Sequence, residues 1–129
     1  MDAIEAEKKA VELVLGEMGL QNKMWGTANE RADASQGQLF HAGFAQLEAT
    51  LDRQMGYPGA FVVPPHIYPA DWSGFRSYGA DIPNMVVGVA FLIQEIKRKL
   101  MNGEDFTRTS RRPDQAYNPE TGLPNTIEA

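Results

Sequence analysis

The chain has 129 residues, a formal net charge of -5 and no cysteine, which suits one domain with a single core. The acidic charge excludes a general nucleic-acid binder, and the lack of cysteine excludes disulfides, thiolate metal sites and a cysteine nucleophile. The longest apolar run is shorter than the roughly 20 residues of a membrane span, and the acidic N-terminus does not resemble a secretory signal, so we expect a cytoplasmic protein.

The first predicted helix covers residues 3–24. Asp2 is placed to cap it, and Glu5 follows three residues later, as in a capping box. Its apolar residues recur at helical spacing and are expected to form one stripe: Ile4, Val11, Val14, Leu15 and Met18. Gly16 and Gly19 each weaken a helix by about 1 kcal/mol relative to alanine, so we expect the helix to end or bend there.

The second predicted helix covers residues 36–55 and ends at Gly56. Ser35 and Gln38 form a second capping-box pattern ahead of it. Large apolar residues repeat along it at steps of four, three, four and four: Phe40, Phe44, Leu47, Leu51 and Met55. This stripe predicts an amphipathic helix whose other side is exposed and charged. The charged residues of that side are Glu48, Asp52 and Arg53.

Residues 57–80 form a long connection that holds four prolines and six aromatic residues. The prolines exclude a long helix, because proline lacks the amide hydrogen and clashes with the preceding turn. Connections of this length are uncommon in compact domains and often carry function. The aromatic residues predict an ordered segment that lies on the domain as a lid or wraps a neighbouring subunit.

The third predicted helix covers residues 82–102, with Asp81 as its cap and Pro83 in its first turn. Nine apolar residues crowd its first dozen positions: Ile82, Met85, Val86, Val87, Val89, Ala90, Phe91, Leu92 and Ile93. A helix with so little polar surface is expected at the centre of a bundle or in a subunit interface. The sequence therefore predicts a homo-oligomer.

These elements together predict an all-α fold. Residues 1–103 are expected to form a three-helix, bundle-like domain that includes the ordered loop at 57–80. Residues 104–129 contain three prolines, three arginines and little that would fill a core. We expect them to form an extended C-terminal arm that is ordered only when a partner holds it.

A basic cluster is the first candidate binding site, and its members are Lys97, Arg98, Lys99, Arg108, Arg111 and Arg112. The planar fork of arginine pairs well with phosphate and carboxylate groups. Trp72, Tyr78 and His66 of the long loop add rings on which a nucleobase stacks. The cluster therefore predicts binding of a nucleotide, another phosphate compound or an acidic protein surface. The alternative is a set of solvated charges that complement the helix dipole.

Three carboxylates are the second candidate site. Glu48 and Asp52 lie four residues apart and share one side of a helix, and Asp81 begins the next helix. If these three met between facing helices, their oxygens would suit a hard divalent cation such as Mg²⁺. The alternative is a solvated helix face and a helix cap.

The segment Gln21-Asn22-Lys23-Met24-Trp25-Gly26, after an acidic helix, resembles a stretch of small phage MazG-like proteins, which are all-α nucleotide pyrophosphohydrolases. The proline-rich loop and the Pro-Glu-Thr-Gly-Leu-Pro tail also resemble small phage accessory proteins. The resemblance implies magnesium held by acidic motifs on two helices, and the matching positions here are Glu48, Asp52 and Asp81. The chain departs from the Glu-Glu-x-x-Glu motif of that family, because its second helix offers only Gln46, Glu48 and Asp52.

We therefore interpret the chain as a non-catalytic, self-associating binding protein for a nucleotide, another phosphate ligand or a host protein. If it is phage-encoded, it would act in the host cytoplasm as an antagonist of host signalling or defence, and it would need no cofactor. The first alternative is a magnesium-dependent MazG-like nucleotide pyrophosphohydrolase. The second alternative is a structural or assembly protein.

Overall fold

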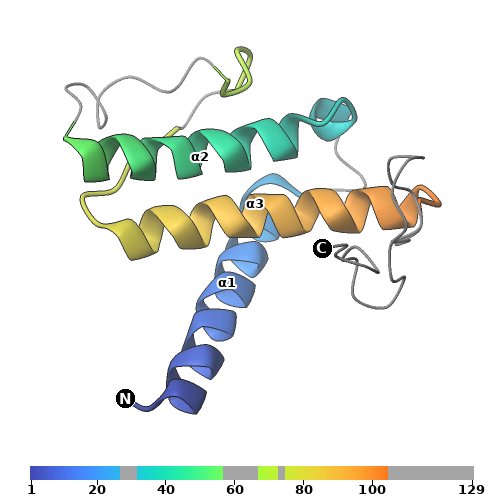
Figure 1. The fold of residues 1–129 in the computed structure, drawn as a ribbon. Helices are drawn as coiled ribbons and strands as arrows, with labels where there is room; N and C mark the ends of the chain where they lie inside the picture. The colour runs from blue at the N-terminus through green and yellow to red at the C-terminus, as the bar shows by residue number, and fades with distance from the viewer. Residues whose placement is uncertain (27–31, 57–66, 73–74, 105–129) are drawn as a thin grey trace, which may run out of the picture.

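The computed structural model describes residues 1–26, 32–56, 67–72 and 75–104, and within these ranges it consists of helices without strands. The elements are α1 (Ala3–Trp25), the short 3₁₀ helix η2 (Ala32–Ala34), α2 (Gln38–Met55) and α3 (Asp81–Met101). The expected all-α, three-helix fold is confirmed. In Figure 1, α2 and α3 lie side by side and antiparallel, and α1 crosses α3 and extends away from the pair. None of the described helices has the length and apolarity that would let it cross a membrane.

Helix α1 begins where the capping pattern predicts, because the Asp2 Oδ1 atom accepts a hydrogen bond of 2.8 Å from the Glu5 amide. The helix does not end at Gly16 or Gly19, as the sequence suggested it could, because it continues to Trp25. It ends at Gly26, whose φ of 83° is a conformation that favours glycine. Packing of the C-terminal half against α3 offsets the weak helix propensity of the two glycines.

Two predicted caps are absent. Ser35 does not cap α2, because the cap position is Gly37 and the Gln38 Oε1 atom instead accepts a hydrogen bond of 2.7 Å from the Gln36 amide. Asp81 does not cap α3 either, because it is the first helical residue and its carboxylate lies against α2. The C-terminal end of α2 at Gly56 is confirmed, with a φ of 74°.

Helices α2 and α3 approach so closely that their backbones touch at two glycines. A Cβ atom added to Gly43 would lie 2.9 Å from the Gly88 carbonyl oxygen, and one added to Gly88 would lie 3.1 Å from the Gly43 carbonyl oxygen. The buried side of α2 suits this contact, because most of its residues are small or carry an amide or hydroxyl group. They are Leu39, Ala42, Gly43, Ala45, Gln46, Ala49 and Thr50.

The large apolar stripe of α2 therefore lies mostly beside the contact with α3 and not within it. Phe40, Phe44, Leu51 and Met55 are each about half exposed, and only Leu47 of that stripe is partly buried. The charged residues expected on the exposed side, Glu48, Asp52 and Arg53, are partly exposed. Small residues are buried instead because they allow the short distance between the two helix axes.

On α1 and α3, too, large apolar residues that the sequence predicts to be buried are exposed. Residues 3–13 of α1 are all exposed, including Ile4 and Val11 of the predicted stripe. On α3, Ile82 and Met85 are exposed, although the apolar run predicts burial. The buried side of α3 is largely polar or small: Asn84, Gly88, Ala90, Phe91, Gln94 and Glu95.

The core is small and aromatic. Phe91 lies at its centre with Ala34, Leu39 and Ala42, and its ring is 6.3 Å from the rings of both Trp25 and Trp72. The described parts of the long connection, residues 67–72 and 75–80, pack against these helices through rings such as Tyr68. Residues 105–129, which hold nearly all of the predicted C-terminal arm, lie outside the described residues.

Candidate functional site

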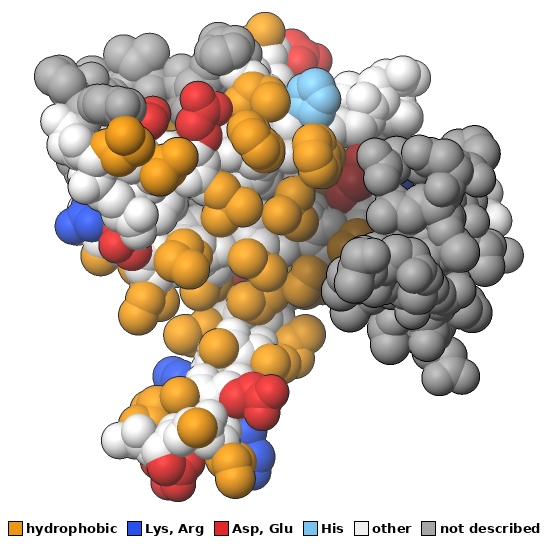
Figure 2. All heavy atoms as spheres, in the orientation of Figure 1, with side chains coloured by type: hydrophobic (Ala, Val, Ile, Leu, Met, Phe, Trp, Pro, Cys, Tyr) orange, Lys and Arg blue, Asp and Glu red, His pale blue; other side chains and the backbone are white. Residues whose placement is uncertain are grey.

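Hydrophobic side chains gather on one face of the molecule, over α2, α3 and α1 (Figure 2). We call this surface the apolar face. We assign to it nine large apolar side chains that are each about half exposed or more: Phe40, Phe44, Leu51 and Met55 on α2, Ile82, Met85 and Ile96 on α3, and Val11 and Leu15 on α1. Half-exposed side chains of this size each leave about 100 Å² accessible, so the face amounts to roughly 1,000 Å². That exceeds the largest apolar patch of a typical monomer, which is about 300–600 Å².

The apolar face has one convex part and one concave part. The convex part is the α2 ridge, made of Phe40, Phe44, Leu51 and Met55, and the rings of Phe40 and Phe44 lie 6.3 Å apart and nearly parallel. The concave part is the α1–α3 groove, a hollow of about 480 Å³ between the N-terminal half of α1 and α3. A smaller hollow of about 250 Å³ continues along the same two helices.

The α1–α3 groove is almost entirely apolar. Its lining includes Ala6, Ala10 and Val14 of α1 and Met85, Val86 and Val89 of α3. Lys9 is the residue of the lining with a charged side chain. An apolar hollow of this size suits apolar side chains of another segment better than it suits a phosphate group.

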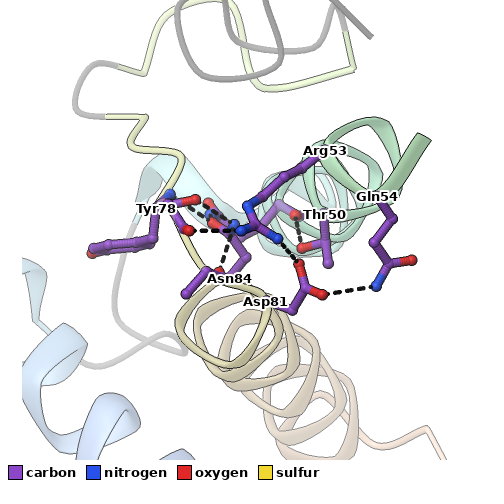
Figure 3. A network of polar contacts seen from close by, with 9 residues as sticks. Thr50, Arg53, Gln54, Tyr78, Asp81 and Asn84 are labelled. Carbon is purple, nitrogen blue, oxygen red and sulfur yellow. Dashed lines mark hydrogen bonds and ion pairs between the residues drawn. The ribbon is translucent and has the colours of Figure 1, made fainter. Parts of the chain in front are cut away.

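A buried amide network fixes the end of the long connection to the helix pair (Figure 3). The Gln46 Nε2 atom donates to Asn84 Oδ1 at 2.6 Å and to the Arg76 carbonyl at 2.9 Å. Asn84 accepts from the Tyr78 amide at 2.9 Å and donates from Nδ2 to the Tyr78 and Ala80 carbonyls. Asn84 is fully buried, so the network satisfies polar groups that water does not reach.

Asp81, a predicted metal ligand, is bound by two side chains of α2 instead. Its Oδ1 atom lies 2.6 Å from Arg53 Nη1, and its Oδ2 atom accepts a hydrogen bond of 3.2 Å from Gln54 Nε2. Arg53 Nη2 also donates to the Gly79 carbonyl at 2.8 Å. Asp81 therefore links the start of α3 to the end of α2, as Figure 3 shows.

The three predicted metal ligands do not come together. Glu48 and Asp52 share one side of α2, whereas the Asp81 carboxylate is held by Arg53 and Gln54. Throughout the described part of the chain, no group of three or more acidic or histidine side chains is arranged to hold a metal ion.

The predicted phosphate site falls largely outside the described residues, which do not include His66, Arg108, Arg111 or Arg112. Lys97 is partly exposed on α3. The Trp72 ring packs against Phe91, and its Nε1 atom donates to the Asp33 carbonyl at 3.3 Å. Tyr78 lines a cavity of about 60 Å³, which holds only one or two water molecules.

Sequence reasoning missed a buried ion pair on α3. Glu95 is 4 % exposed, and its Oε1 atom lies 2.5 Å from Arg98 Nε. This hydrogen bond raises the pKa of Arg98, and burial of the guanidinium opposes the increase. Glu95 follows Asn84, Gly88 and Phe91 at steps of four, three and four, so helical spacing along this second stripe is the signal that locates it.

A second buried polar contact joins α1 to α3. Gln94 donates from Nε2 to Asn22 Oδ1 at 2.9 Å, and both Gln94 and Gln21 are almost fully buried. Like the amide network, this contact places side-chain amides inside the fold while large apolar side chains remain outside. Comparisons of the chain with family models, with characterised proteins and with solved structures find no match.

Proposed function

We propose that this protein is a non-catalytic, self-associating binding protein and that the apolar face is its contact surface. One observation carries the proposal: large apolar side chains are exposed on all three long helices, while much of the interior consists of alanine, glycine and amide side chains around Leu39 and Phe91. A standard protein interface covers about 800 Å² on each partner, so a face of roughly 1,000 Å² is large enough for a stable contact.

Self-association is tested by static light scattering across micromolar concentrations, where we expect a dimer or larger oligomer. Val89→Glu should give a monomer, because Val89 lines both hollows and an unpaired charge there would be desolvated in the contact. Val89→Thr is the matched control and should retain most of the association.

Far-UV circular dichroism of each variant separates dissociation from unfolding. A wild-type protein that scatters as a monomer throughout this range would contradict the proposal. Magnesium-dependent release of pyrophosphate from a nucleoside triphosphate, lost in Glu48→Gln, would contradict its non-catalytic part and support the pyrophosphohydrolase alternative.

For the ligand, we propose a nucleotide or another phosphate compound, or an acidic surface of a host protein. The support is chemical: Arg108, Arg111 and Arg112 follow one another closely, and arginine forks bind phosphate in a bidentate manner. An action against host signalling or defence rests on the resemblance to phage proteins alone.

The arm is tested by replacing both Arg111 and Arg112 with alanine. Calorimetric titration with ATP should show weaker binding, by about 1.5–3 kcal/mol for each charge-assisted hydrogen bond that is lost. The melting temperature should change little, because solvated charges contribute little to folding. If the substitutions instead destabilise the protein or break the oligomer while binding of ATP survives, the arm is a structural strap and the assembly alternative gains support.

A further inference from the structure

We infer that two copies of the chain pair reciprocally, with the α2 ridge of each copy seated in the α1–α3 groove of the other. The inference rests on the proposed self-association and names its partner as a second copy. It concerns how the apolar face is covered, whereas the proposed function requires only that it is covered.

The placement of ridge and groove allows this pairing. Both belong to the apolar face, and α3 lies between α2 and the groove side of α1 (Figures 1 and 2). A two-fold axis through the exposed side of α3 would therefore carry the α2 ridge of one copy onto the groove of the other. Each copy then offers the same two surfaces, as in the isologous dimers that dominate among oligomers.

The sizes of the two parts agree. The ridge presents the paired rings of Phe40 and Phe44, each about half exposed. An apolar cavity of about 150 Å³ accommodates one benzene-sized ring. The α1–α3 groove, at about 480 Å³, has room for both rings.

The charges agree as well. Lys9 is the residue with a charged side chain that lines the groove. Glu48 and Asp52 flank the ridge, four and eight residues after Phe44, so helical spacing places them beside it. Lys9, Glu48 and Asp52 make no ion pair within the described residues. Reciprocal pairing would bring Lys9 of one copy towards Glu48 and Asp52 of the other.

The two other ways of pairing the same face bring like charges together. Groove against groove would place Lys9 near Lys9, and ridge against ridge would place Glu48 near Glu48. Juxtaposed like charges cost several kcal/mol in an interface. Of the three pairings, ridge against groove is the one that brings Lys9 of the groove lining towards the carboxylates beside the ridge.

The test mixes two variants that are each defective in one surface. Phe44→Lys damages the ridge, and Ala10→Glu damages the groove, and both residues are exposed, so the fold should be retained. Alone, each variant should self-associate at least about tenfold more weakly, because the new charge meets Lys9 or Glu48. An equimolar mixture should form the heterodimer, which keeps one intact ridge–groove contact and gains a lysine–glutamate pair.

Native mass spectrometry of the mixture measures the heterodimer directly, since the two variants differ in mass. Lys8→Glu is the matched control for Ala10→Glu, because it places a glutamate on α1 outside the groove lining. It should self-associate like the wild type, and it should not rescue Phe44→Lys.

The outcomes separate the inference from the proposed function. If the wild type does not self-associate, the proposed function fails. If the wild type associates but the mixed variants remain monomeric, or if neither variant weakens association, self-association stands and reciprocal pairing is wrong.

Discussion

Gly43→Val is expected to lower the melting temperature by on the order of 10 °C or more. A Cβ atom at this position would lie 2.9 Å from the Gly88 carbonyl oxygen, so the clash is with the backbone of α3 and no side-chain rotation relieves it. The two helices would have to separate, which places the effect at or above the upper end of the ~1–3 kcal/mol typical of overpacking.

Thermal unfolding followed by circular dichroism measures this effect, and Gly16→Ala is the control. No atom lies within 4 Å of a Cβ placed on Gly16, and the residue is helical, so alanine should stabilise the protein by up to about 1 kcal/mol. Equal melting temperatures for Gly43→Val and the wild type would show that the helices do not meet at these glycines.

Asn84→Leu is expected to destabilise the protein by on the order of 3 kcal/mol, because buried polar groups lose their partners. Four hydrogen bonds of the Asn84 side chain disappear: those with Gln46 Nε2, the Tyr78 amide, the Tyr78 carbonyl and the Ala80 carbonyl. The leucine side chain has the same branched shape and is larger, so no cavity forms and the lost hydrogen bonding causes most of the change.

Hydrogen exchange gives a local readout of the same substitution. The Tyr78 amide donates a hydrogen bond to Asn84 Oδ1, so its hydrogen should exchange much faster in the variant, where this bond is absent. Gln54→Ala is the control, because its hydrogen bond to Asp81 is exposed and its loss should change stability by about 0.5 kcal/mol or less. Unchanged protection of Tyr78 in Asn84→Leu would contradict the role of the amide network.

The helices themselves could be predicted from the sequence. Apolar residues at helical spacing locate α2 and α3 to within two residues, and Gly56 and Asp2 act as the sequence suggests. These features depend on local backbone preferences, which a short window of sequence contains.

The buried faces could not be predicted by ranking residues by hydrophobicity. A stripe such as Phe40–Phe44 shows that a helix is amphipathic, but it does not show whether the stripe meets the same chain or another one. The competing stripe of small residues on α2, Ala42, Ala45 and Ala49, has the same period and is the one that packs inside. The glycine at position 43 beside it signals a close helix contact, and sequence reasoning passed over it.

The candidate site was predictable only in part. Asp81 of α3 forms an ion pair with Arg53 of α2. This ion pair depends on how the two helices align, and the spacing of residues along a single helix does not reveal that alignment. The arginines at 108, 111 and 112 and His66 lie outside the described residues, so their role stays a prediction. The α1–α3 groove depends on the angle at which α1 crosses α3, and no local sequence pattern encodes that angle.

The glycine contact between α2 and α3 has a consequence for the register of the two helices. Each glycine leaves room for a leucine of the other helix, since the Leu92 side chain lies against Gly43 and the Leu47 side chain lies against Gly88. The amide pair of Gln46 and Asn84 makes a slip more costly still, because a shift of one turn, about 5.4 Å, would leave both amides buried and unpaired. The glycines set how near the helices come, and the leucines and amides together select the alignment at which they meet.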